Sequence, residues 1–404
     1  MEKRGDRVNK IVIGASVAAA AATSLAAATP AQAQRQVSVS ASVRAEHQSN
    51  AAHASAAFAA VTGLQRSDEI LSPGIGVNIA LPFGLHNFTL AGSANYTFHR
   101  RNKNRDRENL NFATGLAMNL PICDPNVSAT LSRRISDLGD IVISPSANPV
   151  TIENVETVKA LGGTLACGKD FGLRPTIGIN YEEGRNDETI RKIRDRNVVN
   201  YTAGVAYVHP SIGNLLVSYQ LRELRFPNQI LLDGRENGNR QSSVGATFSR
   251  DIGARLRGSV GVGYSRLKPR QAGVRPFKGM NWSVDLSAQA TSRMMVRAAL
   301  SRATSSSLAV DANYQVNTDY SLSANYVVSP LISIDAGFSA TRRTFEGAPV
   351  PAIPGTQILS GDRRYTFSGS VGYQFSPKLR FSLDAAHERR NGAGSAFDYT
   401  NNRI

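Results

Sequence analysis

The sequence contains two cysteines, one tryptophan and, after residue 33, no long apolar run. A membrane-spanning helix requires roughly 18 consecutive apolar residues, and the mean hydropathy of -0.23 is that of a soluble protein. These absences exclude a bundle of membrane helices. They leave open a membrane β-barrel, because half of each barrel strand is polar. The sequence also lacks a Pro/Ser linker and a heptad stretch, so we expect a single domain after residue 33.

The sequence also lacks the patterns on which enzymes and metal sites depend. The six histidines are scattered, without the His-x-x-x-His spacing that chelates a metal, and no Gly-x-Ser-x-Gly motif supplies a nucleophile. Of these, His47, His99 and His387 fall near predicted strand ends, where a His-Asp or Ser-His pair could still form. We predict no catalytic residue, no metal and no cofactor, and an outer-membrane hydrolase is the most distant hypothesis.

A period-two alternation of apolar and polar residues runs from Gln36 to Ile404. A soluble antiparallel sheet gives the same pattern locally. Its repetition along the chain favours a closed barrel in a bacterial outer membrane, with one face of each strand toward lipid and the other toward water. We therefore predict an all-β fold, a transmembrane antiparallel up-and-down β-barrel of about 18 strands (about 16 to 18) that spans residues 34–404.

Two classes of connection alternate along the chain. Short ones, rich in Pro, Gly, Asn, Asp and Ser, are predicted to be tight periplasmic turns, and longer polar ones are predicted to be outer loops. The short connections are Pro82 to Gly84, Pro121 to Pro125, Gly168 to Gly172, Pro210 to Gly213, Arg250 to Gly253, Thr291 to Arg293, Ser329-Pro330 and Ser376 to Lys378. The longer connections include residues 100–108 and 185–197. Their charged side chains are explained either by simple exposure to water or by binding of a specific ligand.

Aromatic residues cluster near the predicted strand ends, where they would form two girdles at the membrane surfaces. The outer girdle would contain Tyr96, Phe98, Tyr181, Tyr201, Trp282 and Tyr365, and the inner one Phe88, Tyr207, Phe248, Tyr326, Tyr373 and Phe375. Ordinary aromatic enrichment in strands is the alternative explanation.

The N-terminus has the features of a secretory signal peptide. Basic residues are followed by an Ala-rich stretch from Ile11 to Ala28 and by an Ala-x-Ala site at residues 31–33. We predict cleavage near Ala33 and a Gram-negative outer-membrane location. A retained anchor is the alternative, and no lipobox cysteine follows.

The chain is strongly basic. Its formal charge is +15, of which residues 1–33 supply +2, so residues 34–404 keep +13. This favours anionic partners such as lipopolysaccharide phosphates, acidic polysaccharide or anionic solutes, but not nucleic acid. Other expected partners are membrane lipid, the barrel-assembly machinery and components of exopolysaccharide export.

Charged residues on the polar face of the strands are expected to line the lumen, where an excess of Arg would favour anions. The basic ones are Arg44, Arg134, Arg174, Arg222, Arg257, Arg297 and Arg380, and the acidic ones are Glu46, Glu182, Asp285, Asp335 and Asp384. The alternative is that these charges pair and plug a narrow lumen.

Two further expectations concern geometry. Cys123 and Cys167 fall at the same edge of one predicted hairpin, within disulfide reach, the alternative being two free thiols.

The connection from Ser136 to Glu153 is more apolar than its neighbours, and it would fold into the lumen, leaving Arg134 and Arg174 to define a constriction. Covering a neighbouring protomer or lipopolysaccharide is the alternative for this loop.

Two segments carry a resemblance to a known family. Residues 42–50, Ser-Val-Arg-Ala-Glu-His-Gln-Ser-Asn, and the tail 388–404, with its Asp-Tyr-Thr-x-Asn-Arg sequence, resemble a family of outer-membrane β-barrel porins often encoded with exopolysaccharide-export or exosortase loci. The resemblance implies location and architecture but no catalytic residues. The last strand is shorter than the roughly 9 to 11 residues that cross a membrane.

The sequence supports two functions. The first is a passive outer-membrane pore for small hydrophilic or anionic solutes. The second is a non-conducting accessory barrel in exopolysaccharide export or surface anchoring.

Overall fold

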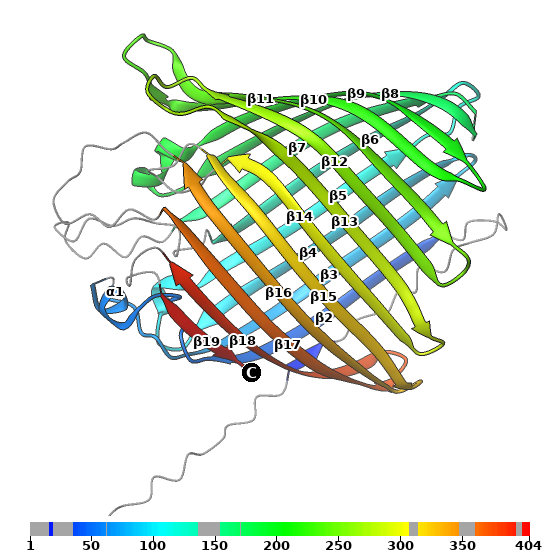
Figure 1. Ribbon diagram of the computed structural model, residues 1–404. Coiled ribbons are helices and arrows are strands. Elements are labelled where there is room, and N and C mark those ends of the chain that lie inside the picture. The colour runs from blue at the N-terminus through cyan, green and yellow to red at the C-terminus, as the bar shows by residue number, and fades with distance from the viewer. Residues whose placement is uncertain are drawn as a thin grey trace, which may run out of the picture.

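The chain forms one closed β-barrel (Figure 1). The computed structural model describes residues 16–18, 35–61, 63–135, 154–169, 171–306, 314–346, 360–392 and 398–404. Eighteen antiparallel strands, β2 to β19, each pair with the next strand in sequence, and β19 pairs with β2 to close the ring. The prediction of an all-β up-and-down barrel near 18 strands is confirmed.

The strands β2 to β10 have the following bounds: β2 Gln36–Gln48, β3 Asp68–Phe83, β4 His86–His99, β5 Arg107–Ala117, β6 Cys123–Ile135, β7 Val155–Cys167, β8 Gly172–Asn186, β9 Arg196–His209 and β10 Gly213–Ile230. The remaining strands are β11 Glu236–Ile252, β12 Leu256–Pro269, β13 Phe277–Thr291, β14 Met294–Ser306, β15 Tyr314–Ser329, β16 Ile332–Glu346, β17 Gly361–Ser376, β18 Leu379–Gly392 and β19 Tyr399–Arg403.

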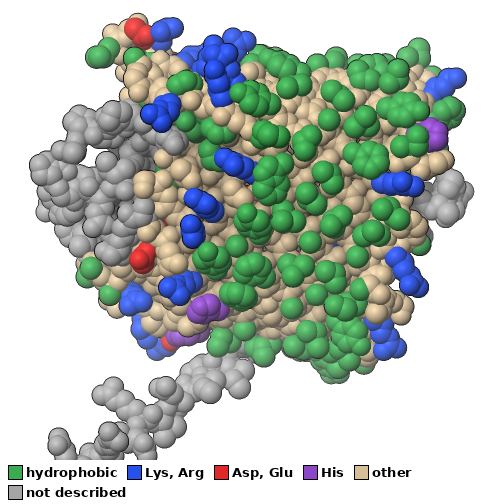
Figure 2. Space-filling model, in the orientation of Figure 1, with side chains coloured by type: hydrophobic (Ala, Val, Ile, Leu, Met, Phe, Trp, Pro, Cys, Tyr) green, Lys and Arg blue, Asp and Glu red, His purple; other side chains and the backbone are tan. Residues whose placement is uncertain are grey.

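The alternation of the sequence becomes an outward apolar face and an inward polar face. Residues paired directly across strands share a face, so Val39 lies beside Val77, whereas Ser40 lies beside Gly76. Val39 is 75% exposed although it is apolar, as expected for a side chain that contacts lipid. Apolar side chains are accordingly spread over the face of the barrel that Figure 2 shows.

Both predicted aromatic girdles have outward positions. Tyr181 and Tyr201, for example, are exposed beside the outward Ile179, and Tyr373 is exposed beside Ile332. The register places the other aromatic residues of the two girdles on the same face, in agreement with the expected contact with the membrane surfaces.

The two ends of the barrel differ as the sequence predicts. At one end, here called the turn end, each predicted short connection reverses the chain, and Gly84 and Gly253 adopt a positive φ of 62° that suits tight turns. At the other, the loop end, longer connections contain α1 (Ala56–Val61), η1 (Lys103–Arg105) and η3 (Thr189–Arg194). None of the described helices is long and apolar enough to cross a membrane.

Closure depends on a short seam between β18, β19 and β2. The five residues of β19 pair with Ala386 to Arg390 of β18, and Arg403 pairs with Gln48 of β2. Two hydrogen bonds between the backbones of His47 and Ile404 extend the contact, at 2.8 and 3.1 Å. Nearer the turn end, β1 (Ser16–Ala18) pairs with both β2 and β18. This segment lies within the predicted signal peptide, so the predicted cleavage would remove it.

A disulfide crosses the hairpin of β6 and β7 at the turn end. The register sets Cys123 directly opposite Cys167, and their sulfur atoms are 2.08 Å apart. The described residues include no free cysteine.

We predict that the unreduced protein contains no alkylatable thiol and gains two alkyl groups after reduction, as measured by intact mass. The variant Cys123→Ser should still form a barrel, because hydrogen bonds hold β6 to β7 along the rest of the hairpin, but it should lose heat resistance in detergent. Two alkyl groups on the unreduced wild-type protein would contradict the pairing.

Candidate functional site

The inward face of the barrel is the candidate site, since it presents small polar side chains and charges to the lumen. On β15 to β17, Ser323, Gly337 and Ser368 are direct cross-strand neighbours on this face. Small side chains leave room for water and solute, so the longer charged side chains between them determine the local width and field.

One group of charges lines a recess beside the seam. Arg44 and Glu46 of β2 face Asp335 of β16, Asp384 of β18 and Arg403 of β19 across it. The Arg44 guanidinium lies 2.7 Å from the Glu46 carboxylate, and Asp335 accepts hydrogen bonds from Asn325 and Ser370. Acidic and basic side chains therefore lie together in this recess.

A second group lies near the loop end of β6 to β9. The Arg196 guanidinium contacts the carboxylates of both Glu156 and Glu182, and the nitrogen–oxygen distance to Glu182 is 3.1 Å. Arg134 lies 3.9 Å from Glu156. Glu156 and Arg196 are largely buried, so this group forms a fixed part of the wall. Neither residue was predicted to line the lumen. Val158 and Val198, the next residues on the same face of each strand, are apolar, and apolar residues indicate the lipid face.

The remaining predicted lumen charges are distributed along the barrel. Arg257 pairs with Asp251 at 2.7 Å, and Arg380 donates a hydrogen bond to Ser333 at 2.9 Å, both near the turn end. The register places the other three on the inward face: Arg222 opposite Asn200, Asp285 opposite Ser259 and Arg297 opposite Ser323.

The expectation that Arg134 and Arg174 define one constriction is wrong. Arg134 is the second-last residue of β6, at the loop end, whereas Arg174 is the third residue of β8, at the turn end, where it pairs with Asp124. Both strands run from the turn end to the loop end, so these two positions lie at opposite ends of the barrel. The loop from Ser136 to Glu153 lies outside the described residues, and its inward folding stays a prediction.

A different connection folds against the inward face. Val198, Leu224 and Phe226 are inward residues of β9 and β10 that are at most 1% exposed. The η3 segment covers them: the Arg194 guanidinium lies 5.4 Å from the centre of the Phe226 ring, and Asn228 donates a hydrogen bond to the carbonyl of Lys192 at 2.7 Å. Apolar residues at inward positions of β10 were the sequence signal that this part of the lumen required a cover.

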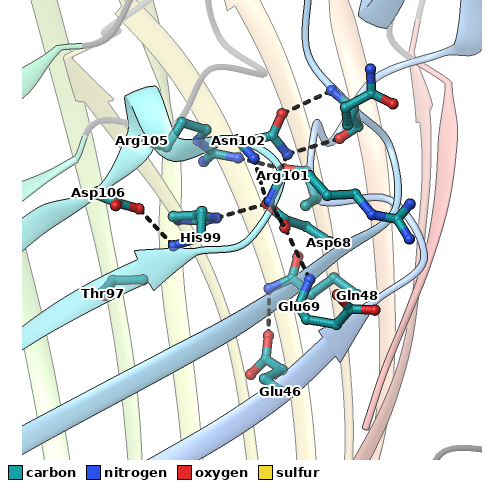
Figure 3. Close-up of polar contacts among 12 residues, drawn as sticks. Glu46, Gln48, Asp68, Glu69, Thr97, His99, Arg101, Asn102, Arg105 and Asp106 are labelled. Carbon is teal, nitrogen blue, oxygen red and sulfur yellow. Dashed lines mark hydrogen bonds and ion pairs between the residues drawn. The ribbon is translucent and has the colours of Figure 1, made fainter.

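Asp68 holds the first two outer connections together (Figure 3). Its carboxylate accepts hydrogen bonds from the backbone of Arg101 and the side chain of Asn102, at 2.9 and 2.8 Å, and lies 3.0 Å from Nδ1 of His99. A His-Asp pair thus does form, but the Asp68 side chain is 0% exposed. An enclosed carboxylate that accepts this many hydrogen bonds serves to anchor the loops rather than to contact a solute.

The two segments that carry the family resemblance meet at the seam. The backbone N–H of Asn50 donates to Oδ1 of Asn401 at 2.9 Å, and the rings of His53 and Tyr399 stack with centres 5.4 Å apart. The Tyr399 hydroxyl donates to Glu388 on β18. These residues close the barrel, so the two segments have a structural role. Within the described part of the chain, no three His, Cys, Asp or Glu side chains form a metal site.

A family model described as Putative beta-barrel porin 2 matches residues 37–404, which is nearly the whole chain. The chain belongs to this family. It is therefore a porin-like barrel of the outer membrane, and its family is one of channels rather than enzymes. The association with exopolysaccharide loci stays a prediction. No curated protein matches the sequence.

Solved structures of other outer-membrane porins resemble the barrel. Pseudomonas aeruginosa OccK2 (OpdF) in complex with glucuronate is 12% identical, with 91% of this chain and 96% of that chain covered and a TM-score of 0.46. A BenF-like porin from Pseudomonas fluorescens Pf-5 is 11% identical, with the same coverage and a TM-score of 0.46. Pseudomonas aeruginosa OpdL is 13% identical, with 92% and 97% covered and a TM-score of 0.45.

We predict that replacing residues 188–194 with a short Gly-Ser linker raises single-channel conductance, because η3 occupies space beside β10. A matched control shortens the connection 231–235, which joins β10 to β11. Equal conductance of the wild-type protein and the η3 variant would show that this segment does not limit the pore.

Proposed function

We propose that this protein is a passive channel for small hydrophilic solutes, anionic ones included, with only weak selection by net charge. The observation that carries the proposal is the pairing of charges on the inward face. Arg44, Arg174, Arg196 and Arg257 each have a carboxylate within 4 Å. An 18-strand barrel is wide enough for an aqueous channel.

Paired charges give a local transverse field instead of a uniformly positive lumen. Such a field orients dipolar solutes such as sugars, while counter-charges nearby reduce the preference for anions that an unpaired row of Arg would produce. The Arg44–Glu46 pair in the seam recess is accessible from the lumen on its Arg44 side, since the Arg44 side chain is 55% exposed. A solute passing β2 would meet this recess directly.

The experiment is reversal-potential measurement in planar bilayers under a KCl gradient. Wild-type protein should conduct with a small reversal potential. The variant Glu46→Gln/Asp384→Asn, which removes two carboxylates from the recess, should shift the potential toward chloride. Arg44→Gln should shift it toward potassium, because Glu46 then lacks its partner.

The outward variant Arg302→Gln serves as a control and should leave the potential unchanged, since its side chain does not face the lumen. Correctly folded wild-type protein that fails to conduct would contradict the proposal and favour the alternative, an accessory barrel in exopolysaccharide export or anchoring.

A further inference from the structure

The outward face of the barrel carries a row of basic residues near the loop end. Along β12, for example, outward positions change from Val262 to Tyr264 and then to Arg266 and Lys268. We call this row the basic band. It consists of Arg240, Arg266, Lys268, Lys278, Arg302, Arg342, Arg363 and Arg389, whose side chains are all exposed. Figure 2 shows blue Lys and Arg side chains among the green apolar ones toward this end.

The register places cations of the basic band directly opposite each other. Arg266 pairs with Lys278, and Arg342 pairs with Arg363. Like charges directly across two strands repel and destabilise a sheet. Arg240 also lies opposite Lys268, and three such pairs on one face are unfavourable unless an anion lies against them.

Acidic side chains do little to offset this repulsion. Glu223 lies 3.6 Å from Arg240, at one edge of the band. Beyond Glu223, no Asp or Glu occupies an outward position of β12 to β18 among the side chains that the structure describes.

The opposite side of the barrel is different, because its outward charges are paired. Arg133 lies 2.9 Å from Glu108 and 3.0 Å from Asp187, and Arg185 lies 2.6 Å from Glu183. At the loop end, the unneutralised positive charge is therefore confined to one side of the outer surface. A need for general solubility would not produce this asymmetry.

We propose that the basic band binds the phosphate groups of lipopolysaccharide in the outer leaflet. The level fits, because the band lies beyond the apolar and aromatic outward residues, where the headgroups of the leaflet begin. The chemistry fits too, because pairs of Arg and Lys form strong charge-assisted hydrogen bonds with phosphate, and such an anion removes the repulsion within each pair. The occupant is a lipid headgroup, since free phosphate has no acyl chains to hold it against the apolar surface below.

The test uses the full-length barrel with Arg266→Ser, Lys278→Ser, Arg342→Ser and Arg363→Ser combined. A matched control carries Lys159→Ser and Arg250→Ser, which are outward residues on the other side and at the turn end. Each protein is mixed with purified lipopolysaccharide, with lipopolysaccharide whose phosphates have been removed, or with inorganic phosphate. Bound lipid and the thermal unfolding midpoint are then measured.

We expect the fourfold variant to bind lipopolysaccharide more than about tenfold more weakly than the control, since each of the four cations near an anionic lipid surface strengthens binding several-fold. Only intact lipopolysaccharide should raise the unfolding midpoint of the control. Equal binding by both proteins, or equal stabilisation by the dephosphorylated lipid or by inorganic phosphate, would overturn the proposal. If the fourfold variant fails to fold, the double variant Lys278→Gln/Arg363→Gln takes its place, with a smaller loss expected.

Discussion

The structure depends on one constraint: a backbone that crosses lipid must satisfy all its hydrogen bonds without water. A sheet can meet this only by closing on itself, so the short seam of β19 with β18 and β2 has a large effect for its size. The side chains confirm its importance. Asn50 and Asn401 are fully buried and hydrogen-bonded to each other across the seam.

Burial in this molecule is concentrated at the loop end and not in a central core. Asp68 links the first two outer connections, Asp195 accepts hydrogen bonds from the backbone and side chain of Asn186, and Asp362 lies between the guanidinium groups of Arg343 and Arg390. Each buried carboxylate is satisfied by several donors, which offsets the cost of removing it from water. These clusters fix the loops that shape the entrance of the barrel.

The sequence predicted the barrel, its strand number and its turns because contact with lipid imposes a regular pattern, as at Val37, Val39 and Val43. It could not predict the cover formed by η3, since the connection 187–195 has no such pattern. Its folding depends on Leu224 and Phe226, which come from a later strand. The positions of Arg134 and Arg174 along the barrel axis were also predicted wrongly. The alternation shows which face of a strand a residue occupies, but not how far along the barrel it lies.

Charge pairing was also beyond the sequence, because it depends on the register of neighbouring strands. Arg196 on β9 contacts Glu156 on β7, two strands away. Arg266 on β12 lies directly opposite Lys278 on the neighbouring strand β13. The excess of basic residues seen in the sequence is therefore divided in two. Several inward Arg residues, such as Arg44, Arg196 and Arg257, have acidic partners, whereas the basic band on the outside does not have enough of them.

Cysteine labelling in intact outer membranes shows whether the inward face lines a water-filled lumen. Single variants at the inward residues Ser323 and Ser368, and at their outward neighbours Leu322 and Phe367, would be treated with a membrane-impermeant maleimide. We expect labelling of Ser323→Cys and Ser368→Cys and protection of Leu322→Cys and Phe367→Cys. Equal labelling at all four positions, or labelling of the outward pair alone, would contradict it.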